Sequence, residues 1–146
     1  MVTLVGTQED FLKALTELIE LDYDAVEAYQ AAIERIKDPV YKENLEEFQQ
    51  DHKRHIQVLS KLIAQHGETP PNGPDMKQLL LKGKIIAASI LGDKAILNAM
   101  KDNEIDTNTA YERLTHHKHK WTEVYDSLED GLKDEKRHKT WLESVT

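Results

Sequence analysis

Apolar residues recur at alternating steps of three and four along four long segments of the chain, and this spacing constrains the fold more than any other feature. Such steps place side chains on one face of an α-helix. Glycine and proline, which interrupt helices, number only 6 and 4 among the 146 residues. Few segments alternate apolar and polar residues as strands do. The sequence therefore predicts an all-α protein, and its length suits a single domain over residues 1–146.

Four long helices are predicted, over about residues 7–37, 39–65, 93–117 and 120–145. Thr7 is expected to cap the first helix, and Pro39 suits the first turn of the second because its missing N–H would have no partner there. Gly131 lies inside the fourth helix at a cost of about 1 kcal/mol relative to alanine, so we expect a local kink. The short connections within each pair of helices predict two antiparallel hairpins.

The connection between these hairpins, residues 67–92, is long and contains the apolar segment "LLLKGKIIAASIL". A helix of about 25 residues is about 38 Å long, so a connection with a short helix of its own can return along that length. The sequence thus predicts a four-helix bundle of two hairpins joined by a long crossover. We expect the apolar segment to cap the bundle first, and to form the surface of a homodimer second.

The composition excludes several classes of function. The chain has no cysteine, which excludes disulfides, thiolate metal sites and iron–sulfur clusters. A formal net charge of −8 argues against nucleic acid as a partner. No stretch approaches the roughly 20 apolar residues of a membrane span, and the N-terminus lacks the basic start of a signal peptide. These observations predict a cytoplasmic protein that does not enter a membrane.

Charged and imidazole side chains interrupt each apolar stripe near its middle, and the helical spacing turns them inward. One lies on each of the first and third helices and a pair on each of the others: Asp22, Glu104, His52 with His55, and Glu135 with His138. The midpoint between Asp22 and the first pair falls on Asp38, and that between Glu104 and the second pair falls on Lys120. Both positions are predicted turns, so all six side chains are expected at one height of the bundle.

The two pairs lie in a repeated hexapeptide, "QDHKRH" at residues 50–55 and "KDEKRH" at 133–138. Glu104 follows Asp22 by 82 positions (104 − 22), and His138 follows His55 by 83 (138 − 55). A duplicated helical hairpin is therefore predicted. Its basic residues, Lys53, Arg54, Lys136 and Arg137, are expected on the solvated face. Asp51 is an alternative core carboxylate, although it falls off the apolar stripe.

Three carboxylates and three imidazoles that converge from four helices suit one or two divalent metal ions. These oxygen and nitrogen donors favour iron, manganese or zinc over calcium or copper(I). Tyr29 and Tyr111 lie two turns along from Asp22 and Glu104, and we expect them to donate hydrogen bonds to the ligands. The remaining histidines near the last turn are expected in an exposed loop rather than at a metal: His116, His117 and His119.

At these residues the sequence resembles the ferritin-like superfamily, and the rubrerythrin-type di-iron bundles in particular. In that family, the first and third helices each carry a glutamate followed by a tyrosine seven residues later, and the second and fourth each carry an E-x-x-H pair. Here "EIDTNTAY" at 104–111 and "EKRH" at 135–138 match the pattern, whereas Asp22 and His52 replace glutamates. The overall layout, with "KDP" after the first helix and "GDKAIL" before the third, is also similar to small bacterial ferritin-like proteins of the DUF2383 type.

The resemblance implies a di-iron or related non-haem site with an oxidase, peroxidase or iron-handling role in oxidative stress. Because the chain lacks a cysteine domain for electron transfer, a partner protein would supply electrons. With three carboxylates in place of four, a single ion, or zinc, is an alternative to two irons. A further alternative is a metal-free helical bundle that acts in stress or in interactions and retains only the fold, with the polar residues as a buried network that fixes the helix register.

Overall fold

The structure is a computed structural model that describes residues 3–74 and 79–146. Within these ranges all regular secondary structure is helical and there is no strand, which confirms the predicted all-α class. The elements are α1 (Phe11–Arg35), α2 (Pro39–Gln65), α3 (Leu79–Ser89), α4 (Asp93–Thr115), the 3₁₀ turn η2 (Thr122–Val124) and α5 (Tyr125–Val145). Residues 75–78 of the predicted crossover lie outside the described residues.

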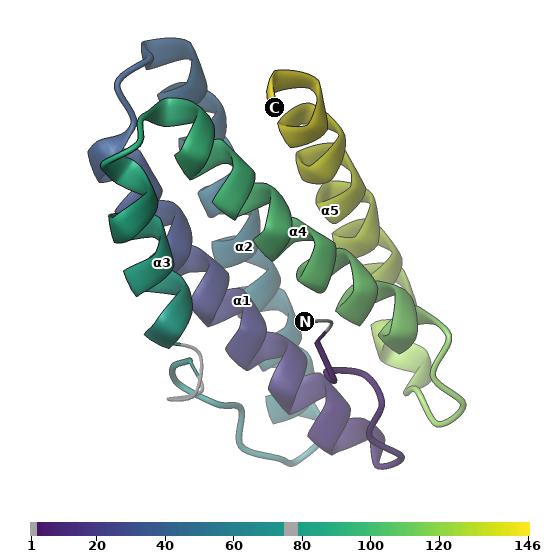
Figure 1. The fold of residues 1–146 in the computed structure, drawn as a ribbon. Helices are drawn as coiled ribbons and strands as arrows, with labels where there is room; N and C mark the ends of the chain where they lie inside the picture. The colour runs from purple at the N-terminus through teal and green to yellow at the C-terminus, as the bar shows by residue number, and fades with distance from the viewer. Residues whose placement is uncertain (1–2, 75–78) are drawn as a thin grey trace.

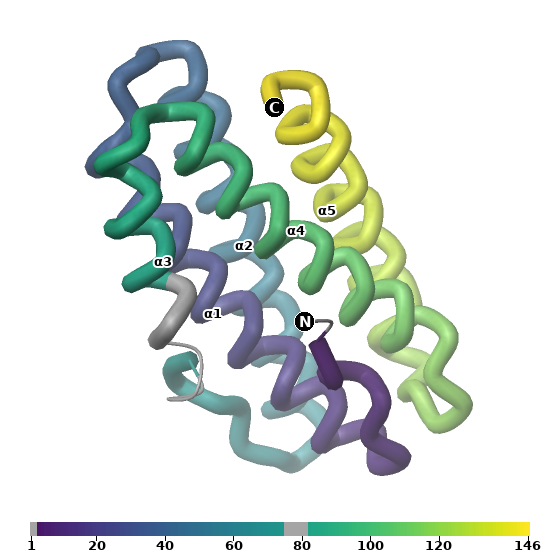
Figure 2. The backbone as a smooth tube through the Cα atoms, viewed as in Figure 1, coloured from purple at the N-terminus to yellow at the C-terminus, as the bar shows by residue number. Residues whose placement is uncertain are grey.

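Helices α1 and α2 form one antiparallel hairpin, and α4 and α5 form a second beside it (Figure 1). The tube in Figure 2 shows that α3 runs toward the end of the bundle where α4 begins, and α3 lies against both α1 and α4. The carboxylate of Asp93, the first residue of α4, accepts hydrogen bonds from the backbone N–H groups of Lys37 and Asp38, each at 2.9 Å. The turn of the first hairpin is thereby held to the start of the second.

The first helix begins later than the expected Thr7 cap. The hydroxyl of Thr7 donates to the carbonyl oxygen of Leu4 at 2.6 Å, so this threonine belongs to a turn that precedes the helix. Asp10 is the N-cap, and its carboxylate accepts a hydrogen bond from the N–H of Leu12 at 3.1 Å. For α2, the carboxylate of Asp38 accepts from the N–H of Val40 at 2.8 Å, and the helix starts at Pro39.

The last helix also starts later than the predicted residue 120. Trp121 precedes it and is held outside the helix by two ring contacts, an edge contact with Phe11 at 5.3 Å and a stack on His66 at 3.6 Å between centroids. The 3₁₀ turn η2 follows, and α5 then runs as one helix through Gly131. Side-chain packing of a tryptophan, rather than a local sequence signal, sets this boundary.

The apolar core consists of two clusters, one at each end of the bundle. The first includes Phe11, Leu15, Leu18 and Leu114, and the second includes Ile33, Leu45, Leu97 and Leu142, all at most 7% exposed. The middle of each long helix lies between the clusters. This arrangement places the inward-facing polar residues of the sequence in a layer that is shielded from water at both ends.

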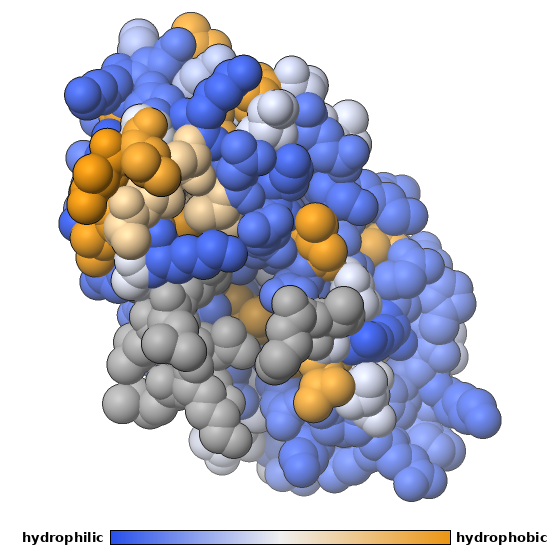
Figure 3. Space-filling model, viewed as in Figure 1, coloured by the Kyte–Doolittle hydropathy of each residue, from blue (hydrophilic) through white to orange (hydrophobic). Residues whose placement is uncertain are grey.

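The segment before α4 is partly buried and partly exposed. Ile85 of α3 is fully buried, which agrees with the expectation that this segment caps the bundle. Figure 3 shows apolar side chains over the end of α3 and the turn after it, where Ile90 and Leu91 are 86% and 83% exposed. A homodimer through this surface stays a prediction.

In the part of the chain that the structure describes, no helix combines the length and the apolar character that a bilayer span requires.

Candidate metal centre

The six side chains predicted as metal ligands meet in the middle of the bundle, and all are buried. They come from α1, α2, α4 and α5: Asp22, His52, His55, Glu104, Glu135 and His138. Their ligand atoms form two overlapping groups of four in which all atoms lie within 4.8 Å of one another. Both groups contain His52 and Glu135. The structure therefore brings together every residue of the predicted layer, and metal binding by them stays a prediction.

The first group, called here the His55 half, contains Asp22 and His55 with the two shared residues. Nδ1 of His55 lies 3.5 Å from Asp22 Oδ1 and 3.5 Å from Glu135 Oε1. Nδ1 of His52 lies 2.8 Å from Asp22 Oδ1 and 3.4 Å from Glu135 Oε1. Two imidazole nitrogens and two carboxylates thus face a common point.

The second group, called here the His138 half, contains Glu104 and His138 with the same two shared residues. Nδ1 of His138 lies 3.4 Å from Glu104 Oε1 and 3.7 Å from Glu135 Oε2. Nε2 of His52 lies 3.2 Å from Glu104 Oε1. His52 therefore directs one ring nitrogen to each half, and Glu135 directs one oxygen to each half. The sequence repeat that relates the two hairpins also relates the two halves, since Asp22 and His55 of one correspond to Glu104 and His138 of the other.

His55 and His138, the last residues of the two hexapeptides, are each oriented by an aspartate from the other copy. Nε2 of His55 lies 2.8 Å from Asp134 on α5, and Nε2 of His138 lies 2.8 Å from Asp51 on α2. A carboxylate on one ring nitrogen fixes the ring and leaves the other nitrogen for a metal. Nδ1 of both histidines faces inward, where it has no hydrogen-bond partner among the described residues, and Oε1 of Glu135 likewise has none.

Two arginines connect these aspartates to each other. Arg54 pairs with Asp51 at 2.9 Å and also with Asp134, and Arg137 pairs with Asp51 at 2.6 Å and with Asp134 at 3.3 Å. Both arginines lie on the solvated face as predicted, with side chains 53% and 45% exposed, and they also form these ion pairs, which the sequence did not predict. Asp51 lies off the apolar stripe as expected, yet it is buried because α5 covers it. The repeated spacing D-x-x-R-H was the sequence signal for this ion-pair network.

The predicted tyrosine donors lie in the layer and cross between helices. The hydroxyl of Tyr29 on α1 donates to Glu104 on α4 at 2.5 Å, and that of Tyr111 on α4 donates to Asp22 on α1 at 2.7 Å. Thr107, which the sequence gave no reason to single out, places its hydroxyl 2.9 Å from Glu135 Oε2 and 3.1 Å from Glu104 Oε2. Each carboxylate of the layer thus receives a hydroxyl donor in addition to imidazole contacts.

The electrostatics of the layer favour protonated histidines when no metal is bound. Burial alone would lower the pKa of His52, but Glu135, Asp22 and Glu104 outweigh it and raise that pKa to about 9. Burial is likewise outweighed at His55 and His138, where Asp134 and Asp51 raise the pKa to about 12 and about 11. Three imidazolium groups then balance three carboxylates. A metal ion that binds here must displace these protons.

The carboxylates respond to burial and to the histidines in different ways. Burial and the charge of Glu104 raise the pKa of Glu135. Burial also acts on Glu104 and Asp22, but contacts with the histidines outweigh it and lower the pKa of both. With its histidines neutral, the layer offers imidazole nitrogen and carboxylate oxygen to each half, which is a donor set suited to a divalent transition metal.

Comparison with known proteins supports this description of the fold. The family described as "Domain of unknown function (DUF2383)" matches residues 10–117. A similar solved structure is "YcfI, a putative structural protein from Rhodopseudomonas palustris", with a TM-score of 0.78 and 18% identity over 93% of this chain and 92% of that one. No curated protein matches the chain. At 18% identity, the likeness to YcfI concerns the fold alone.

Proposed function

The chain belongs to the DUF2383 family, whose function is unknown, and we propose that it is a ferritin-like protein that binds divalent transition-metal ions in its buried layer. One observation carries the proposal. Nδ1 of His55, Nδ1 of His138 and Oε1 of Glu135 are buried and have no hydrogen-bond partner in the described part of the chain, while aspartates contact the other ring nitrogen of both imidazoles. Buried polar atoms in native proteins are nearly always paired, so these inward-facing atoms call for a ligand.

Iron is the first candidate, with manganese and zinc as alternatives, because carboxylate and imidazole donors suit all three. The resemblance to rubrerythrin-type bundles supports iron, which when bound would supply oxidase, peroxidase or iron-handling chemistry with electrons from a partner protein. Three carboxylates balance one trivalent ion, whereas two divalent ions would leave one excess positive charge. The stoichiometry of one or two ions is therefore part of the proposal to be measured.

Metal content of the protein purified without chelators is the direct test. We expect about one metal ion or more per chain, and a loss of most of it in the double variant His55→Ala/His138→Ala. His119→Ala is the matched control, since this histidine is exposed in the turn before α5 and should leave the content unchanged. Less than about 0.2 ion per chain, with no uptake of iron, manganese or zinc, would contradict the proposal.

A second candidate is a metal-free structural protein. It is favoured by the charge balance of the layer, in which three protonated histidines already neutralise three carboxylates. The description of YcfI as "a putative structural protein" also favours this candidate. This candidate predicts that chelators leave the melting temperature unchanged, whereas a metal protein is destabilised by chelation in proportion to its affinity.

A further inference from the structure

The two halves of the layer differ in what covers them. The shift that relates the two hexapeptides pairs Phe48 on α2 with Gly131 on α5 (131 − 48 = 83). The same shift pairs Trp141 on α5 with Val58 on α2 (141 − 58 = 83). Two large aromatic side chains beside the His138 half thus correspond to glycine and valine beside the His55 half.

The aromatic pair closes the His138 half. The ring of Phe48 stacks on the imidazole of His138, with centroids 4.2 Å apart and an angle of 28° between the rings. Trp141 lies edge-on to Phe48 at 5.5 Å, and Tyr29 approaches it at 6.4 Å. Phe48 is only 2% exposed and His138 is fully buried. No space is left between this histidine and the aromatic rings.

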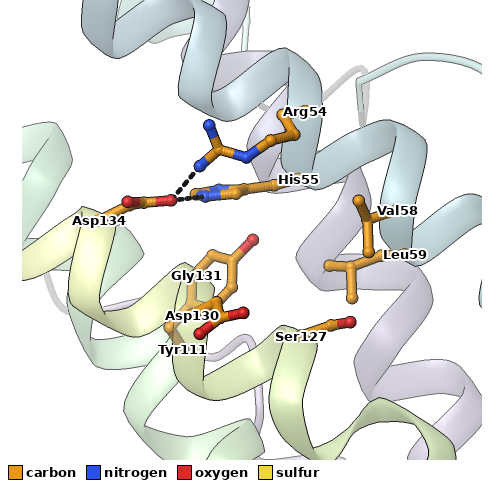
Figure 4. Close-up of a pocket in the computed structure, with 9 residues that line it drawn as sticks. All are labelled: Arg54, His55, Val58, Leu59, Tyr111, Ser127, Asp130, Gly131 and Asp134. Carbon is orange, nitrogen blue, oxygen red and sulfur yellow. Dashed lines mark hydrogen bonds and ion pairs between the residues drawn. The ribbon is translucent and has the colours of Figure 1, made fainter.

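The His55 half borders a pocket instead. The pocket has a volume of about 200 Å³, and its lining includes His55, Val58, Leu59, Tyr111, Ser127 and Gly131. Figure 4 shows an open space with Tyr111 and Asp130 on one side and Val58 and Leu59 on the other. Gly131 and Val58, the counterparts of Phe48 and Trp141, thus both belong to the lining of this pocket.

Two walls of the pocket also touch the layer. His55 places Nδ1 3.5 Å from Asp22, and Tyr111 donates its hydroxyl to the same carboxylate at 2.7 Å. The two rings lie 5.4 Å apart. On the inner side of these two rings, Nδ1 of His55 and Oε1 of Glu135 lie 3.5 Å from each other. Neither atom has a hydrogen-bond partner among the described residues. Only the side chains of His55 and Tyr111 thus separate a ligand in the pocket from the inward-facing atoms of the His55 half.

Gly131 is required for the position of Tyr111. A Cβ atom at residue 131 would lie 2.5 Å from Cε1 of Tyr111, which is closer than real Cβ atoms approach other atoms. The tyrosine ring therefore packs against the backbone of α5 at residue 131, and the side chain of any other residue at that position would displace the ring. Gly131 thus makes room for the ring of Tyr111, whose hydroxyl reaches Asp22.

The chemistry of the lining indicates the class of ligand. Arg54, His55 and Asp134 are already paired with one another, so their charges are satisfied. Asp130, at the exposed side of the pocket, opposes anions. The remaining surface is largely apolar. An apolar cavity of about 150 Å³ holds benzene, so a pocket of about 200 Å³ has room for any small molecule up to about that size.

We propose that this pocket admits a small uncharged ligand to the metal in the His55 half, and that Phe48 and Trp141 exclude the same ligand from the His138 half. The proposal rests on the proposed metal binding. It makes the two halves unequal: one holds a metal that exchanges a ligand with solvent, and the other holds a metal that does not.

Nitric oxide is a suitable probe, because it is small and uncharged and gives ferrous sites a characteristic electron paramagnetic resonance signal. The protein is loaded with ferrous iron without oxygen, its metal content is measured, and nitric oxide is titrated. We expect one nitric oxide per chain. Val58→Trp copies Trp141 into the pocket and should weaken nitric oxide binding by about tenfold or more, with unchanged metal content. Val40→Trp, on the same helix but remote from the pocket, should behave as wild type.

The outcomes separate this proposal from the proposed function. A chain that takes up no metal overturns both. Normal metal content with no nitric oxide bound, with binding in both halves, or with wild-type binding in Val58→Trp overturns the ligand pocket alone. A circular dichroism melt of each variant verifies that it folds, and Val58, at 39% exposure, is a position where a larger side chain is accommodated at the surface.

Discussion

Asp51 on α2 lies 2.8 Å from Nε2 of His138 on α5, so an acidic residue of one hexapeptide orients the histidine of the other. Asp134 does the same for His55 in the opposite direction. The repeated sequence is therefore two interlocking halves of one network rather than two independent sites. Neither copy can orient its own histidine.

Asp51→Asn should weaken metal binding while leaving the fold intact. The amide can still contact His138, but it carries no charge to hold the imidazole in the orientation that presents Nδ1. Loss of such an outer partner typically costs about 10–100-fold in metal affinity. Competition titration with a metal-binding dye measures the effect. Asp126→Asn, at an exposed position of α5, is the control, and equal affinities for the two variants would contradict this role of Asp51.

Tyr111→Phe should destabilise the protein by about 1–3 kcal/mol, because Asp22 loses a hydrogen bond in a buried site. Urea unfolding followed by circular dichroism provides the measurement. Tyr41→Phe is a matched control, since that ring is only partly buried and packs on Trp141. If the two variants lose the same stability, the hydrogen bond between Tyr111 and Asp22 contributes nothing specific.

Metal-free protein should become less stable as the pH rises above about 6.5. The pKa of His52 is raised from 6.5 to about 9 in the folded state, so its proton stabilises the fold fully below pH 6.5 and this contribution is lost as the pH passes 9. The raised pKa values of His55 and His138 extend the loss to higher pH. Urea unfolding in the presence of a chelator, at several pH values between 6 and 10, tests the sign.

Added metal should show the opposite dependence on pH. Protons and metal ions compete for the same imidazoles, so the rise in melting temperature caused by metal should grow with pH over this range. Thermal melts with and without metal, at matched pH, separate the two effects. A metal-induced rise that shrinks with increasing pH would mean that the metal binds elsewhere.

Gly131→Ala should destabilise the protein, although alanine normally stabilises a helix by about 1 kcal/mol relative to glycine. The new Cβ would collide with the ring of Tyr111 and push its hydroxyl away from Asp22. Gly83→Ala in α3 is the matched control, because a Cβ there meets nothing within 4 Å and should be neutral or stabilising. Urea unfolding measures the change in the free energy of unfolding for both variants. A change of the same sign in the two would refute the close contact at Gly131.

Helical spacing was sufficient to predict the all-α fold and the six side chains that the structure brings together. Periodicity identifies the inward face of one helix, and the turn positions set the relative heights. It does not show what a neighbouring helix places opposite an off-stripe residue. The contacts of Asp51 with His138 and of Arg54 with Asp134 were not predicted for that reason, since α5 supplies both partners. The pocket was not predicted either, because its lining comes from α2, α4 and α5, and the periodicity of one helix does not show which residues of three helices meet.

The division of the apolar core into two clusters has a consequence for how the bundle opens. The clusters at the two ends are separated by the layer, so the cooperativity between them passes through hydrogen bonds and charges rather than through continuous apolar packing. When that layer is weakened, each end becomes free to open separately, as a partly independent unit with its own hydrogen-exchange rates. The ionic middle of the bundle thus determines whether the protein opens as one body or as two.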